Sequence, residues 1–155
     1  MRFSHSALNR FMLCPAKFDM GYNQGFWSKY TDDVPLLMGS GWHDDKERFW
    51  KGKPPGFTPQ YADKLESNEK IVLECMAQVY REQYNLDGYT INAVEKKYTI
   101  PFGGHTLTFV VDAHVNYNGH SVLVEHKTTR SDIEKDWYWP SEQLDHQTGL
   151  YVWAC

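Results

Sequence analysis

Two acidic residues and a lysine flank a turn signal in the second half of the chain. Asn118-Gly119 is a dipeptide favoured in two-residue hairpin turns, and residues that favour strands run on both sides of it. With this dipeptide as the turn, the strand register places Asp112 directly opposite Glu125. Opposed residues share a face with Cβ atoms roughly 4.5–5.5 Å apart, and Lys127, two residues after Glu125, shares that face. The sequence therefore predicts two carboxylates and an ammonium side by side.

The opposite face of this hairpin is mostly apolar and suits a protein core, because it carries Val111, Ala113, Val115, Val122, Val124 and His126. Like charges that face each other destabilise a sheet, and a bound cation would reverse that effect. Mg²⁺ is a hard ion that one or two carboxylates hold together with water and substrate phosphate. An adjacent ammonium can orient an attacking water and stabilise developing charge. The pattern indicates a metal-dependent hydrolytic centre, and the alternative is a solvent-exposed face with scattered charges.

A second turn signal extends the acidic cluster. Gly103-Gly104 also suits a two-residue turn, and in that register Glu95 lies opposite Asp112 from the other side. Three carboxylates would then meet at one point of the sheet. Glycine-rich turns allow the strand register to slip, so this second register is less firmly specified than the first.

The elements that must position these residues follow from the periodicity of apolar residues and from turn signals. Four helical segments are expected: one capped by Ser4 or Ser6, with Leu8, Phe11, Met12 and Phe18 as its apolar stripe and an interruption at Cys14-Pro15, then Leu36 to about Trp50, Tyr61–Tyr84 and Glu142–Ala154. Three strands are expected over Ala93–Ile100, His105–Tyr117 and Ser121–Thr128, followed by a loop over Thr129–Pro140. This order predicts an α/β fold with an α+β-like arrangement of helices, a three-strand antiparallel meander and a helix.

The second helical segment carries a run of polar side chains that allows two interpretations. His43 lies one helical turn from both Gly39 and Glu47, and a lone helical histidine is usually structural. Glu47 fits a partner of His43 or a solvated charge better than a ligand. The intervening residues Asp44, Asp45 and Lys46 fit an exposed charged face.

Length and composition bound the class of protein. With 155 residues, 41% hydrophobic and 23% charged, the chain can fold as one globular domain. A formal net charge of −4 argues against a strongly basic DNA-coating protein but does not exclude binding to nucleic acid, because a bound metal inverts the local charge. The chain has no apolar run of membrane-spanning length, no apolar core of a secretory signal, and three scattered cysteines that suggest no disulfide framework. A cytoplasmic protein without a membrane partner is expected.

Val111-Asp112, followed by Val124–Thr128, resembles the D…(D/E)xK signature of the PD-(D/E)XK nuclease superfamily. Further segments are similar to the branch of RecB-like nucleases and CRISPR-associated single-strand exonucleases, and they occur in that branch's order: Ser6–Phe11 with Cys14–Phe18 for its S-x-L…CPxxF opening, Gly39–His43 for its GxxxH helix, Glu95 for an acidic residue at the first core strand, and Gln147–Tyr151 for its QxxxY helix. Each segment is weak alone, but the ordered set covers nearly the whole chain. The resemblance implies a restriction-endonuclease-like core, with helices flanking a central mixed sheet.

The resemblance also implies a metal-dependent deoxyribonuclease, namely an exonuclease in a recombination, repair, phage or CRISPR context. The implied site comprises Asp112, Glu125, Lys127, Gln147 and Tyr151 for catalysis, and His43, Asp112, Glu125 and the backbone carbonyl of His126 for Mg²⁺ or Mn²⁺, with Glu95 and Glu47 as further candidates. Lys127 would act on the attacking water, and the QxxxY pair would line the phosphate side of the substrate. Candidate DNA contacts are Trp137, Tyr138, Trp139 and Arg130, because aromatic rings stack on unpaired bases and arginine pairs with phosphate. The alternative for these rings is that they pack their own loop down.

Three departures from the family pattern shape the remaining expectations. Val110 stands where the family often has glycine two residues before the aspartate, which should not remove a ligand. The chain stops at Cys155 within the QxxxY helix, so we expect residues 1–155 to be a single nuclease-like domain, C-terminally truncated, without the fourth core strand. In some relatives the counterpart of Cys14 joins three later cysteines in a [4Fe–4S] cluster, and this chain lacks that set, so no cluster is expected. The alternative functions are a non-catalytic DNA-binding module and an inactive fragment.

Overall fold

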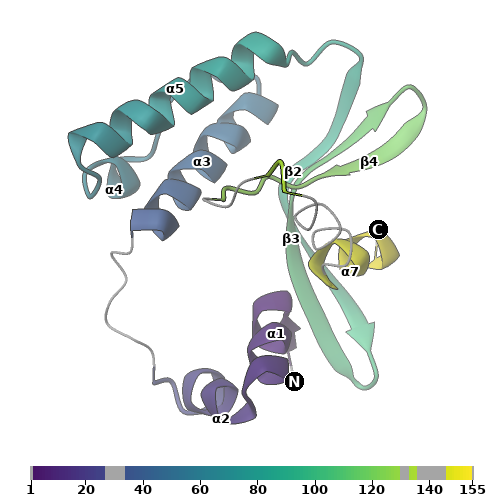
Figure 1. Ribbon diagram of the computed structural model, residues 1–155. Coiled ribbons are helices and arrows are strands. Elements are labelled where there is room, and N and C mark those ends of the chain that lie inside the picture. Colours follow the sequence, from purple (N-terminus) through teal and green to yellow (C-terminus); the bar gives the residue numbers. More distant parts are fainter. Residues whose placement is uncertain (1, 27–33, 130–132, 136–145, 155) are drawn as a thin grey trace. The chain divides into compact units, whose positions relative to one another are not determined.

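The computed structural model describes residues 2–26, 34–129, 133–135 and 146–154 (Figure 1). The chain divides into two compact units, which we call the terminal unit and the central unit. The terminal unit comprises Met1–Thr31, Lys97–Val110 and Ser131–Cys155, and the central unit comprises Asp32–Lys96 and Val111–Arg130. Each unit is described by itself.

The sheet is mixed, and strand β3 (His105–Tyr117) is its hub. Strand β2 (Tyr89–Phe102) neighbours β3, and strand β4 (His120–Val124) pairs with β3 in antiparallel fashion. Strand β1 (Arg2–Ser4) pairs with β3 in parallel, from Arg2–Thr106 to Ser4–Thr108. The predicted α/β fold with a mixed sheet is confirmed, but the sequence reading missed β1, because a three-residue strand shows no alternation of apolar and polar positions.

Both hairpin turns form where the sequence predicts them. The central residues of each turn, Gly103 and Gly104 in one and Asn118 and Gly119 in the other, have φ values of 54°, 76°, 50° and 80°. Two successive positive φ values define the tight turn that matches the twist of paired strands, and glycine and asparagine adopt them at least cost. The predicted register of the second hairpin holds from Tyr117–His120 to Ala113–Val124. β4 ends at Val124, however, so the expected strand over Ser121–Thr128 is too long at its far end.

The helices of the central unit are α3 (Val34–Trp50), α4 (Pro59–Ala62) and α5 (Ser67–Gln83). The expected single helix over Tyr61–Tyr84 is wrong, because a new helix begins after Glu66. The Glu66 side chain accepts a hydrogen bond from the backbone N–H of Glu69, the third residue of α5. In return, the Glu69 side chain accepts a hydrogen bond from the Glu66 backbone N–H at 2.7 Å. This reciprocal cap satisfies backbone donors at the start of α5 and ends the preceding turn.

The cores of the central unit pack α3 against α5 and against the hairpin. One cluster of buried residues contains Leu37, Trp42, Leu65 and Leu73, and a second contains Phe49, Trp50, Ala113 and Val115. At the α3–α5 crossing, a Cβ built on Gly41 would lie 2.6 Å from Leu73 Cδ2, so a larger residue at this position would force the Leu73 side chain to shift.

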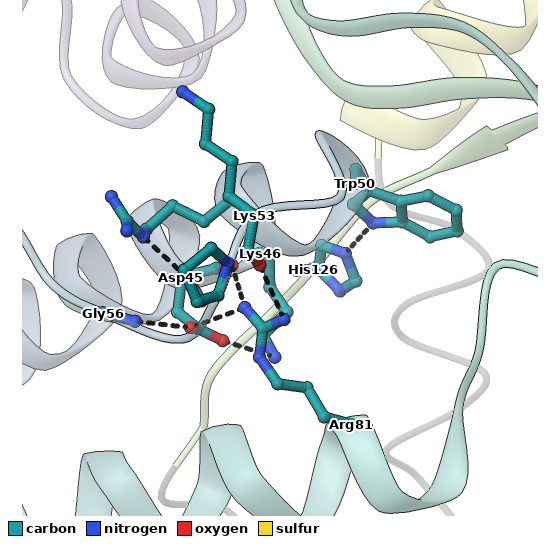
Figure 2. A network of polar contacts seen from close by, with 9 residues as sticks. Asp45, Lys46, Trp50, Lys53, Gly56, Arg81 and His126 are labelled. Atoms are coloured by element: carbon teal, nitrogen blue, oxygen red, sulfur yellow. Dashed lines mark hydrogen bonds and ion pairs between the residues drawn. The ribbon is translucent and has the colours of Figure 1, made fainter.

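A buried ionic network joins the same two helices, shown in Figure 2. Asp45 and Lys46 are 0% and 1% exposed, so the expectation of an exposed charged face was wrong for these two residues. The Asp45 carboxylate accepts hydrogen bonds from Arg81 Nη2 at 2.9 Å and from the Gly56 backbone N–H at 3.3 Å, and it lies 3.0 Å from Lys46 Nζ. The physical reason is a tertiary partner: Arg81 of α5 reaches Asp45 from 36 residues away in the sequence.

The terminal unit contains helices α1 (His5–Leu13) and α2 (Pro15–Phe18), the π-helical segment η1 (Asp19–Asn23), and α7 (His146–Ala154). Ser4 caps α1, since its hydroxyl accepts from the Ala7 N–H at 3.2 Å. The expected stripe is only partly correct, because Phe18 is buried while Phe11 and Met12 are 50% and 58% exposed. Within the described ranges, no helix has both the length and the apolar character needed to cross a membrane.

Candidate metal centre

Asp112 is the buried acidic residue around which the site is built. It lies on β3, 8% exposed, one position beyond the last ladder pair of the β3–β4 hairpin. Its Oδ2 atom accepts a hydrogen bond from the His126 backbone N–H at 2.6 Å and lies 3.2 Å from His43 Nδ1. Burial raises the pKa of the Asp112 carboxyl, but these two contacts outweigh burial and lower the pKa below its ordinary value. Asp112 is therefore held as a carboxylate.

His43 approaches this carboxylate from α3, as the sequence predicts. The hydrogen bond with Asp112 raises the pKa of His43 above its ordinary value, despite the opposing effect of burial. The charges of Asp112, Glu125 and Glu95 act in the same direction. Three neighbouring carboxylates are more than a purely structural histidine requires, so this environment favours a functional interpretation of His43.

Glu95 completes a group of three donors. One ligand atom each from His43, Glu95 and Asp112 lie within 4.8 Å of one another. Glu95 has a φ of 49°, a left-handed conformation that is rare and costly for a side chain other than glycine and that often marks functional sites. Burial and the neighbouring carboxylates raise the pKa of Glu95 to about 7, because two negative charges are unfavourable here without a cation. Two carboxylates and an imidazole suit a divalent metal ion, so the donor set fits one.

Glu125 and Lys127 follow β4 in a segment without regular secondary structure. Lys127 Nζ donates a hydrogen bond to Glu125 Oε1 at 2.8 Å. The Lys127 side chain is 38% exposed and the Glu125 side chain is 21% exposed. Burial raises the pKa of the Glu125 carboxyl, and the lysine only partly offsets this. The structure thus gathers His43 and Glu95 closely around Asp112, while Glu125 is directed toward Lys127.

His126, between these two residues, turns its side chain into the core, as the predicted alternation requires. Its Nε2 atom accepts a hydrogen bond from Trp50 Nε1 at 3.0 Å (Figure 2). The ring is buried against Trp42 and Tyr80. Burial lowers the pKa of His126 to about 4, so the imidazole is neutral. The sequence did not lead us to expect this contact of Trp50 with His126. The signal that could have indicated it is the spacing of Trp50, which lies seven residues, or two helical turns, after His43 on the same helix face.

A hollow of about 780 Å³ opens over the site. Its walls include His43, Glu47 and Glu95 together with Gly39 and Thr128. Glu47 also forms an ion pair with Lys51, just past the end of α3. The hollow gives a substrate access to the acidic group from one side.

The remaining predicted residues belong to the terminal unit or fall outside the described residues. Gln147 Nε2 donates to the Tyr151 hydroxyl at 2.8 Å on α7, and the Tyr151 ring, 7% exposed, stacks on Phe109 within the terminal unit. The four candidate DNA contacts Arg130, Trp137, Tyr138 and Trp139 fall outside the described residues. Cys14 and Cys75 are free and exposed.

A mixed sheet flanked by helices, with His43, Glu95 and Asp112 gathered where they could hold one metal ion, is consistent with a restriction-endonuclease-like fold. The family model of the PD-(D/E)XK nuclease superfamily matches residues 2–155, and the chain belongs to this superfamily. Membership implies a nuclease that uses divalent metal ions. Searches of curated proteins and of solved structures gave no significant match.

Proposed function

We propose that this chain is the core of a Mg²⁺- or Mn²⁺-dependent deoxyribonuclease of the RecB-like branch, an exonuclease acting in a recombination, repair, phage or CRISPR context. The observation that carries the proposal is the group formed by His43, Glu95 and Asp112, with the Glu125–Lys127 pair in the adjoining segment. The acidic group suits a metal ion, and the Lys127 ammonium would supply a positive charge for the hydrolysis step beside that ion.

Asp112, Glu125, His43 and the backbone carbonyl of His126 would hold the ion, with Glu95 as a further ligand. When bound, the ion would polarise the scissile phosphate and lower the pKa of a water molecule. His43 must then be neutral, so metal loading would remove the proton that its contact with Asp112 now favours. The carboxylate of Asp112 needs no such change, because it is already ionised.

Lys127 would orient the attacking water and stabilise the charge that develops on the phosphate. Its ammonium lies 2.8 Å from Glu125 Oε1, which fixes the direction of an otherwise flexible side chain. Gln147 and Tyr151 of the terminal unit would contact substrate phosphate, and Arg130, Trp137, Tyr138 and Trp139 would contact DNA.

The test compares cleavage and binding of labelled single- and double-stranded DNA. Lys127→Ala should reduce kcat by roughly 100-fold or more while DNA binding persists, because a transition-state interaction is lost and ground-state contacts remain. Asp112→Ala should lose metal binding and activity together. Calcium should support binding with little turnover, because its looser coordination orients water poorly. Lys53→Ala is a matched control, since Lys53 is exposed and contacts Arg81 through its backbone oxygen.

Metal-independent cutting, or an undiminished rate for Lys127→Ala, would reject this mechanism. A protein that binds DNA but never cuts it with any metal would instead support the alternative function, a DNA-binding module that retains the fold.

A further inference from the structure

The indole of Trp50 holds the peptide segment that carries Glu125 and Lys127. Its Nε1–H donates to His126 Nε2 at 3.0 Å, and both residues are buried, at 4% and 8% exposure. A buried indole N–H requires an acceptor, and the ring is also packed edge-on against Phe49 and Tyr89. The hydrogen bond therefore fixes the orientation of the imidazole rather than merely filling space.

The segment needs such a tether because the strand ladder has ended. The last ladder pair is Ala113–Val124, so Glu125 to Lys127 have no strand pairing of their own. Two contacts anchor the middle residue instead: the His126 backbone N–H donates to Asp112, and the His126 ring accepts from Trp50. The anchored His126 ring is 8% exposed, whereas the side chains of its two neighbours, Glu125 and Lys127, are 21% and 38% exposed.

Helix α3 supplies both ends of this arrangement. His43 contacts Asp112, and Trp50, seven residues later on the same helix face, contacts His126. Between them on α3, the buried Asp45 is bound by Arg81 of α5, and Lys46 Nζ lies 3.9 Å from the Trp42 ring centroid and 3.7 Å from that of Tyr80. These contacts fix the helix along its length (Figure 2).

We propose that Trp50 is a positioning residue for the metal centre, acting through His126 to hold the backbone that presents Glu125 and Lys127. The inference rests on the proposed nuclease function, because its consequence is the correct placement of a ligand and of the lysine that acts on water. Trp50 touches neither metal nor substrate. Partners that orient metal ligands in this way typically contribute 10- to 100-fold to metal affinity or activity.

The central test is Trp50→Phe, which removes the N–H and keeps most of the ring. We expect Mn²⁺ affinity of the DNA-free protein, measured by calorimetry, and kcat to fall by roughly 10- to 100-fold, with little change in KM for DNA. Trp42→Phe is the matched control. It makes the same chemical change on the same helix, at a residue of similar burial that packs 6.4 Å from the His126 ring, but it leaves the hydrogen bond to His126 Nε2 intact.

Variants of His126 separate positioning from stability. His126→Gln can still accept from the indole through its side-chain oxygen and should retain most of the Mn²⁺ affinity, whereas His126→Phe should lose it. The double variant Trp50→Phe/His126→Phe removes both polar partners, so stability in urea should recover toward that of wild type. Mn²⁺ affinity and kcat should stay low in that double variant.

Recovery of Mn²⁺ affinity together with stability in the double variant would overturn the inference, as would equal losses for Trp42→Phe and Trp50→Phe. A wild-type protein that neither binds Mn²⁺ nor cuts DNA would overturn the proposed function first and this inference with it. A wild-type protein that does both, beside an unchanged Trp50→Phe variant, would overturn the inference alone.

Discussion

Replacing Asp45 by asparagine should destabilise the protein far more than the change of one atom suggests. The side chain is fully buried and faces two cations, Arg81 at 2.9 Å and Lys46 at 3.0 Å. Removing the negative charge leaves the Lys46 ammonium, 1% exposed, beside the Trp42 and Tyr80 rings, a neutral amide and the like charge of Arg81. Breaking a buried ion pair from one side costs about 3–5 kcal/mol, a large share of the roughly 5–15 kcal/mol that stabilises a typical domain.

Urea denaturation followed by tryptophan fluorescence measures this loss, and Asp63→Asn serves as the control. Asp63 is exposed, so the same chemical change there should alter stability by less than about 0.5 kcal/mol. The effect should also depend on pH. Burial alone would raise the pKa of Asp45, but Arg81 and Lys46 lower it overall, so the ionised form stabilises the fold. That contribution is complete above the ordinary aspartate pKa of about 3.9 and is lost as the pH falls through the folded-state value.

The difference between wild type and Asp45→Asn should therefore be constant near neutral pH and shrink below about pH 4. A loss below about 1 kcal/mol at neutral pH would show that water screens the network, as it does at a protein surface, and would refute the reasoning. A difference that grows in acid would refute the assignment of Asp45 as the stabilising charge.

Two further predictions concern the metal-free site and the helix crossing. Because the pKa of Glu95 is raised to about 7, the metal-free protein should lose stability as the pH rises from about 4.5 toward 7. In thermal denaturation, the stability of Glu95→Gln should depend less on pH than that of wild type. A stronger pH dependence in this variant would contradict the assignment. Gly41→Ala should cost about 1–3 kcal/mol in urea denaturation, because the new methyl would meet Leu73 Cδ2 at 2.6 Å, whereas Gly149→Ala on α7, with no atom within 4 Å, should be neutral or stabilising. Equal effects of the two glycine substitutions would refute close packing at the crossing.

Local chemistry made the hairpin end of the site predictable. The dipeptides at both turns favour positive φ, and a two-residue turn fixes which residues face each other, so the pairing from Tyr117–His120 to Ala113–Val124, one position short of Asp112, was predictable from the sequence alone. The apolar alternation on the other face also placed His126 in the core. These are short-range rules, in which each residue's position follows from those beside it.

Long-range partners were not predictable in the same way. A run such as Asp44–Lys46 looks like a solvated face until a cation arrives from another helix, and Arg81 is 36 residues away. The end of α4 and the start of α5 depended on a glutamate cap in a stretch whose apolar periodicity continued through it. The end of β4 depended on an aspartate side chain accepting the His126 N–H, which alternation patterns do not report.

The geometry of three successive residues explains why the site combines such different environments. In the proposed function, Glu125 and Lys127 would need access to water and substrate, whereas a segment beyond the end of a strand with no anchor would hold neither in place. His126 resolves this conflict, because its backbone belongs to the site and its ring belongs to the core. Its neutral imidazole suits a dry aromatic surrounding, while Asp112, 2.6 Å from its backbone, stays ionised. The boundary between the charged centre and the apolar core thus runs through His126. Helix α3 contacts both sides of this boundary, because His43 contacts the Asp112 carboxylate and Trp50 contacts the His126 ring.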